Sequence, residues 1–166
     1  MVDQPDLTFP LTLWLEEQIM RIAIGADHAG FHLKETVAAF LGELGHEVHD
    51  FGAYDAEPSD YPNFARAVGE AVAQGKFERG ILVCGNGIGA CITANKVPDI
   101  RAAVCHDTLS ARQGKEHDDV NVLCLGERII GTELALEIVR VWLAAEFSGL
   151  ERYRRRLAQV AELEGK

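Results

Sequence analysis

The residues best suited to chemistry in this chain gather around one short glycine-rich segment. Cys84 directly precedes Gly85–Gly89, whose sequence is Gly-Asn-Gly-Ile-Gly. A thiolate acts as a base or a nucleophile, and the positive end of a following helix favours the thiolate. The free N–H groups of such a loop suit a phosphate or the oxyanion of an enediolate. A buried strand cysteine before a tight turn that requires positive φ is the alternative interpretation.

Polar pairs also follow other apolar segments that are typical of strands. They are Asp27-His28, Asp60-Tyr61 and His106-Asp107. In a parallel sheet the carboxyl ends of the strands meet at one edge, so these pairs and Cys84 are candidates for one site. His117 and Asp118 instead precede a strand, which places them at the opposite edge within one subunit. His117 can therefore join the site only from a neighbouring chain or by an unusual path.

The elements that must position these residues alternate along the chain. Apolar runs predict strands at 21–25, 47–51, 80–84, 101–105 and 120–125. Helices are expected between them at 31–44, 63–74, 90–96, 108–116 and 132–147, with a last helix at 151–164. This alternation predicts βαβ units with right-handed crossovers. We expect an α/β fold, a three-layer α/β/α sandwich with a five-stranded parallel Rossmann-like sheet and a C-terminal helix.

Length and composition indicate a single domain. The chain has 166 residues, of which 48% are hydrophobic, and this suits one core. We assign residues 20–166 to the domain and residues 1–19 to an N-terminal extension that is expected to be flexible. The net charge of −10 argues against a nucleic-acid partner, and the apolar runs are too short to span a membrane. Four cysteines without a C-x-x-C pair are typical of a reduced, cytoplasmic protein.

One basic cluster stands out against this acidic background. Its members are Arg152, Arg154, Arg155 and Arg156. The cluster is too short to follow a nucleic acid, but it is sufficient for a single phosphate group. Composition alone favours the alternative of a solvated helix face.

Taken in order, the polar pairs, the glycine-rich segment and the basic cluster make the chain from Met20 to about Glu162 similar to ribose-5-phosphate isomerase type B. That family includes the galactose-6-phosphate isomerase subunits and related pentose and tetrose phosphate isomerases. The resemblance implies aldose–ketose isomerisation of a phosphosugar, most directly ribose 5-phosphate to ribulose 5-phosphate, with no cofactor and no metal. It also implies a homodimer or homotetramer whose sites combine residues of two subunits. The matching segments are Gly25–Phe31, Asp60–Pro62, Ile81–Gly89, Ala94–Lys96, Ile100–Ala102, His117–Leu123 and Gly126–Arg128.

The resemblance further implies roles for individual residues. Cys84 matches the catalytic base that moves a proton between C1 and C2, and His117 matches the residue that opens the furanose ring. Asn86 lies in the loop around the reacting end of the sugar. The positions that match substrate-binding residues are Asp27, His28, Tyr61, Gly85, Gly87, Ile88, Gly89, Asp118, Arg128 and, as the phosphate-binding pair, Arg152 and Arg156.

Departures from the family pattern bear on the substrate. Asn86 replaces the usual Thr or Ser, Tyr153 replaces a common phosphate-contacting His, and Asp118 replaces a frequent Asn. Another phosphosugar, such as a tetrose 4-phosphate, allose 6-phosphate or galactose 6-phosphate, therefore remains an alternative. A non-catalytic sugar-phosphate-binding protein is a second hypothesis, against which the intact Cys84 and His117 argue. A flavodoxin-like nucleotide-binding module is weaker, because a full G-x-G-x-x-G is missing.

Overall fold

The computed structural model describes residues 18–165, so most of the predicted extension at 1–19 lies outside the described residues. The order of strands and helices agrees with the prediction, and the largest boundary shift is at α5, which ends at 144 rather than 147. A 3₁₀ turn, η1 (His28–Gly30), precedes the first helix. The elements are β1 (Arg21–Ala26), α1 (Phe31–Glu43), β2 (Glu47–Asp50), α2 (Tyr61–Ala73), β3 (Arg79–Cys84), α3 (Ile88–Ala94), β4 (Ala102–Val104), α4 (Thr108–Asp118), β5 (Val122–Gly126), α5 (Thr132–Ala144) and α6 (Glu151–Glu162).

The five strands form one parallel sheet in the order β2-β1-β3-β5-β4. From β1 the chain moves outward to β2 at one edge, whereas from β3 it passes to β4 at the other edge and then returns to β5, between β3 and β4. The order of strands therefore reverses between β1 and β3, and such a switch point opens a crevice at the carboxyl ends of the strands. Ala26 pairs with Val83 and Cys84 pairs with Gly126, so the carboxyl ends of β1, β3 and β5 lie level.

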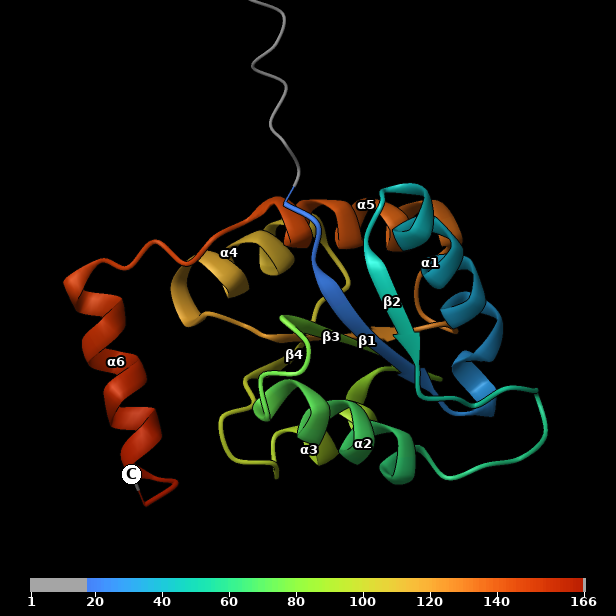
Figure 1. Ribbon diagram of the computed structural model, residues 1–166, viewed down its shortest axis with the longest axis horizontal. Coiled ribbons are helices and arrows are strands. Elements are labelled where there is room, and N and C mark those ends of the chain that lie inside the picture. Colours follow the sequence, from blue (N-terminus) through green and yellow to red (C-terminus); the bar gives the residue numbers. More distant parts are fainter. Residues whose placement is uncertain (1–17, 166) are drawn as a thin grey trace, which may run out of the picture.

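Helices cover both faces of the sheet, which confirms the predicted three-layer sandwich (Figure 1). Helices α1, α4 and α5 pack on one face through side chains that include Val37, Ala111 and Ile138. Helices α2 and α3 pack on the other face through side chains that include Val68 and Ala90. Strand β3 is buried along its whole length, as expected for a central parallel strand with apolar contacts on both faces.

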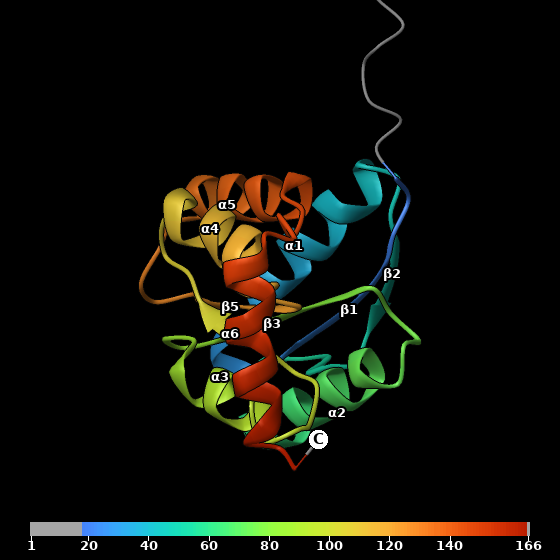
Figure 2. The same cartoon turned by 90° about the vertical axis from the view of Figure 1, so that its left-hand side faces the viewer.

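Helix α6 stands beside the sandwich rather than within either helical layer (Figure 1). Figure 2 shows it running from the level of α4 to the level of α3. The backbone N–H of Ser148, just before α6, donates to the carbonyl of Glu116 near the end of α4 (3.0 Å). Beyond its other end, Glu164 Oε2 accepts the N–H of Asp99 (3.0 Å), just before β4. Both contacts are with segments that precede strands, so α6 lies toward the amino ends of β4 and β5.

A buried arginine determines where the chain leaves α5 toward α6. The Arg79 guanidinium donates to the carbonyl of Trp142 and to that of Ala145, the latter at 2.8 Å, and its central carbon lies 5.0 Å from the Trp142 ring centroid. Carbonyls at the end of a helix lack intrahelical partners, so a cation there is favourable. Burial lowers the pKa of Arg79 from its ordinary value.

None of the helices within residues 18–165 is long and apolar enough to cross a membrane.

Candidate active site

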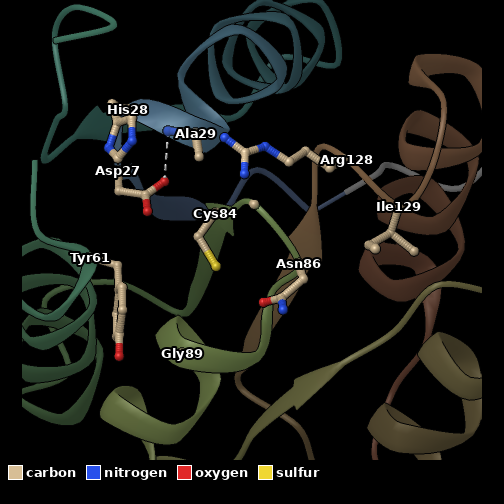
Figure 3. A pocket seen from close by; sticks show the side chains of 10 residues that line it. Asp27, His28, Ala29, Tyr61, Cys84, Asn86, Gly89, Arg128 and Ile129 are labelled. Carbon is tan, nitrogen blue, oxygen red and sulfur yellow. Dashed lines mark hydrogen bonds between the residues drawn. The ribbon is translucent and has the colours of Figure 1, made fainter. Parts of the chain in front are cut away.

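A pocket of about 420 Å³ opens at the carboxyl ends of β1 and β3, at the switch point of the sheet (Figure 3). The turns after β1, β3 and β5 and the start of α2 enclose it. Eight of its ten lining residues belong to the set predicted from the sequence, and two, Ala29 and Ile129, do not. The lining residues are Asp27, His28, Ala29, Tyr61, Cys84, Gly85, Asn86, Gly89, Arg128 and Ile129.

The Asp27 carboxylate organises the turn after β1. Its Oδ1 accepts the backbone N–H of Ala29 (3.0 Å) and of Gly30 (3.1 Å), so it is the N-cap of η1. A Cβ atom at Gly30 would lie 2.4 Å from the carbonyl oxygen of Val83 and 2.8 Å from the nitrogen of Cys84. Only glycine therefore allows this turn to close against the end of β3. The closure brings a buried carboxylate to the same pocket as the Cys84 thiol.

His28 and Tyr61 enter the pocket through the loop between β2 and α2. The backbone N–H of His28 donates to Ser59 Oγ (3.0 Å), and the ring Nδ1 lies 3.1 Å from the carbonyl oxygen and 3.2 Å from the nitrogen of Ser59. The loop thus engages Nδ1, and Nε2 faces away from Ser59. Tyr61 is the first residue of α2, and its ring lies so close to Gly89 that a Cβ there would be 2.6 Å from Cζ. Tyr61 and Gly89 therefore shape one wall together.

The glycine loop contacts the Cys84 thiol directly. The backbone N–H of Gly87 donates to Cys84 Sγ, with an N···S distance of 3.1 Å. A donor at this position stabilises negative charge on the sulfur. Gly87 has a φ of +81°, a conformation that favours glycine, and it is the N-cap of α3. Asn86 Oδ1 accepts the N–H of Ile88 (3.1 Å), which fixes the carboxamide. Gly87 and Ile88 themselves do not line the pocket.

The turn after β5 closes the pocket from the other side of β3. The N–H of Glu127 donates to the carbonyl of Cys84, and the N–H of Arg128 donates to the carbonyl of Gly85, both at 3.0 Å. Through these bonds the Arg128 side chain lies beside the loop: Nη1 is 3.7 Å from the position of a Cβ at Gly85. Arg128 therefore brings positive charge to the pocket.

Two residues outside the pocket lining hold this turn in place: His106, a candidate from its place after an apolar segment, and Glu127, which the sequence did not single out. His106 Nε2 accepts the N–H of Gly126 (3.0 Å), and Glu127 Oε2 accepts the N–H of Leu33 in the first turn of α1 (2.9 Å). Burial lowers the pKa of His106, against the opposing effect of the Asp107 carboxylate. The bond to Gly126 uses an unprotonated ring nitrogen, so it agrees with a neutral imidazole.

The other predicted residues gather outside the pocket. The His117 ring stacks on the Tyr153 ring, with centroids 4.4 Å apart and planes inclined by 13°. The guanidinium carbons of Arg152 and Arg156 lie 4.6 and 5.9 Å from the Tyr153 centroid. Asp118, the exposed last residue of α4, adjoins this group. We call His117, Arg152, Tyr153 and Arg156 the α4–α6 cluster.

Strand β5 separates the α4–α6 cluster from the pocket. Helix α4 ends before Val122 begins β5, whereas Gly126 at the other end of that strand pairs with Cys84. A strand rises about 3.3 Å per residue, so His117 lies at the opposite edge of the sheet from the thiol, as expected for a single subunit. Within residues 18–165, no group of three or more His, Cys, Asp or Glu side chains is placed to hold a metal ion.

Comparison with known proteins finds similarity that spans both the pocket and the α4–α6 cluster. A family model described as Ribose/Galactose Isomerase matches residues 22–160. Ribose-5-phosphate isomerase B of Escherichia coli is 45% identical over 144 residues, which are 87% of this chain and 96% of that protein. D-erythrulose-4-phosphate isomerase of Pectobacterium atrosepticum is 49% identical over 133 residues, 79% of this chain and 87% of that protein. The structure of Clostridium thermocellum ribose-5-phosphate isomerase B superimposes with a TM-score of 0.87 at 51% identity, and covers 88% of this chain and 98% of its own.

The neutral His106 predicts a pH-dependent stability. Its pKa in the folded chain is below the ordinary value of about 6.5, so between these two values the unfolded chain binds more protons. The free energy of unfolding should therefore fall as the pH is lowered through about 6.5. His106→Gln should flatten this decline, as measured by urea unfolding at a series of pH values. Equal pH dependence in both proteins would contradict a role for His106.

Proposed function

Because this chain belongs to the ribose/galactose isomerase family and is a sugar-phosphate isomerase, we propose that it interconverts ribose 5-phosphate and ribulose 5-phosphate through proton transfer by Cys84. The contact between the Gly87 N–H and Cys84 Sγ carries this proposal, because it places a hydrogen-bond donor on the sulfur inside the pocket. The pocket volume of about 420 Å³ lies within the range of small-molecule sites.

The proton transfer uses the thiolate twice. Cys84 takes the proton from C2 of the open-chain aldose, which leaves an enediolate across C1 and C2. The thiol then returns the proton to C1 while the hydroxyl proton moves from O2 to O1, and the ketose results. The backbone N–H of Ile88 donates to Asn86 Oδ1 and thereby orients the carboxamide. The amide NH₂ of Asn86 then donates to the enediolate oxygen.

The remaining lining residues bind the sugar. Asp27 accepts hydrogen bonds from sugar hydroxyls, and His28 donates to them. The turn η1 holds the Asp27 carboxylate in place, and Ser59 holds the His28 ring. Tyr61 lies against Gly89 at the edge of the pocket, and Arg128 adds positive charge beside Gly85.

The phosphate and the ring-opening step belong to the α4–α6 cluster of a second copy. In one chain, His117 is separated from Cys84 by the length of β5. Arg152 and Arg156 are exposed on a helix that stands beside the sandwich, so they are available to a neighbour. In a homodimer or homotetramer, His117 donates a proton to the ring oxygen as the C1–O4 bond breaks, and O1 passes its proton to water. The two exposed arginines bind the phosphate.

The substrate assignment is tested with a panel of phosphosugars. The full-length chain should show its highest kcat/KM with ribose 5-phosphate, because the pocket and the α4–α6 cluster together supply both a base and a ring-opening group. The comparison substrates are erythrose 4-phosphate, allose 6-phosphate and galactose 6-phosphate. A higher kcat/KM with erythrose 4-phosphate would transfer the assignment to tetrose phosphates, and turnover of none would refute the proposed reaction.

Cys84 is tested in the same assay. Cys84→Ser should lower kcat by about a hundredfold to ten-thousandfold, while a titration followed by calorimetry should show that ribose 5-phosphate still binds. Cys91→Ser is the matched control, since Cys91 is a partly buried thiol outside the pocket. Turnover retained in Cys84→Ser would exclude the thiol as the base.

Sharing of sites between subunits is tested by mixing two inactive variants. The Cys84→Ala and His117→Ala variants are unfolded together and refolded as an equal mixture. Half of the resulting dimers are mixed, and each mixed dimer has one intact site. The mixture should therefore recover about a quarter of wild-type activity on ribose 5-phosphate. A mixture as inactive as either variant, with mixed dimers verified by native mass spectrometry, would place each site within one chain.

A further inference from the structure

Tyr153 is a residue of the α4–α6 cluster to which the proposed reaction assigns no task. It is the buried residue of α6, with 8% of its surface exposed, whereas most other side chains of this helix face solvent. Its ring therefore anchors α6 to the end of α4. The residue that it contacts there is His117, the proposed ring-opening group.

The contact with His117 is a face-to-face stack. The two planes are inclined by only 13° and the centroids are 4.4 Å apart, so the flat surface of Tyr153 covers the imidazole. Such a contact opposes rotation of the histidine ring about its side-chain torsions, because a rotated ring collides with the tyrosine. The direction of the imidazole nitrogens thereby depends on Tyr153.

The same tyrosine also contacts both proposed phosphate-binding arginines. Arg152 Nη2 donates to Tyr153 Oη (3.1 Å), and its guanidinium carbon lies 4.6 Å from the ring centroid. Arg156, one turn further along α6, lies 5.9 Å from that centroid. A guanidinium near an aromatic ring is attracted by the electrons of the ring. One side chain thus contacts the imidazole and two otherwise exposed cations.

We propose that Tyr153 is a positioning residue that holds His117, Arg152 and Arg156 at a preset geometry, so that they enter a neighbouring pocket as one unit. This inference rests on the proposed function. Long arginine side chains lose rotamer freedom when they bind phosphate, and holding them beforehand reduces that loss. The alignment of the imidazole matters more, because a displacement of about 1 Å from the reacting atoms costs about a hundredfold in rate.

The chemistry of the sugars separates the two parts of this role. Ribose 5-phosphate closes to a furanose through its C4 hydroxyl, so it needs ring opening. In erythrose 4-phosphate the hydroxyl that would close a five-membered ring carries the phosphate, so this sugar stays acyclic. Misalignment of His117 lowers kcat for the cyclic substrate alone, whereas misalignment of the arginines raises KM for both substrates.

Two substitutions at Tyr153 test the proposal. Tyr153→Leu should lower kcat for ribose 5-phosphate by about tenfold to a hundredfold, leave kcat for erythrose 4-phosphate within about twofold, and raise KM for both. Tyr153→Phe keeps the ring and loses the bond to Arg152, so it should restore kcat and leave only the increase in KM. Arg155→Gln is the control on the same helix, because Arg155 pairs with Glu151 instead of contacting Tyr153. Equal losses of kcat on both substrates would overturn the proposal.

A spectroscopic measurement makes the test independent of turnover. The ring protons of His117, assigned in the NMR spectrum by comparison with His117→Gln, should be shifted upfield by the tyrosine ring. The shift should persist in Tyr153→Phe and disappear in Tyr153→Leu. Unchanged His117 signals in Tyr153→Leu would overturn the proposal even if the enzyme is active. If wild type converted no phosphosugar, the proposed reaction would fail, and the NMR comparison would still decide whether Tyr153 holds the imidazole.

Discussion

A side chain at Gly30 or Gly126 would collide with the backbone that surrounds Cys84. A Cβ at Gly30 would lie 2.4 Å from the Val83 carbonyl oxygen, and one at Gly126 would lie 2.7 Å from the Cα of Asn86. Gly87 has positive φ and turns its N–H toward the sulfur. The pocket exists because these three turns approach each other without intervening side chains. Each glycine lowers local stability, because glycine loses more backbone entropy on folding than other residues do. Its missing side chain is what allows the close approach.

The same approach connects the site to both helical layers. The turn after β5 bonds to the carbonyls of Cys84 and Gly85, and the Glu127 carboxylate reaches the first turn of α1. On the opposite layer, Tyr61 begins α2 and lies against Gly89 at the start of α3. A displacement of either layer would therefore move a wall of the pocket. The thiol sits at the centre of this frame, on a strand that is buried throughout.

Two of the three departures from the family pattern fall in different parts of the proposed complete site. Asn86 stands in the loop after Cys84, where its carboxamide accepts the N–H of Ile88. Tyr153 stands in the α4–α6 cluster, where it stacks on His117. The first change bears on the oxygens of the proposed enediolate, and the second bears on the proposed ring opening and phosphate binding.

The sequence by itself determined the order of strands and helices and most of the pocket. Residues such as Asp27 and Cys84 follow apolar strands, and in a parallel sheet the ends of strands share an edge, so local pattern was sufficient to bring them together. Tertiary structure alone decided the contacts of His106 with Gly126 and of Glu127 with Leu33, which join residues 20 and 94 positions apart. It also decided that the Gly87 N–H points at the sulfur and that Tyr153 stacks on His117. Bonds between distant segments depend on how layers pack, and strand and helix periodicity carries no information about that packing.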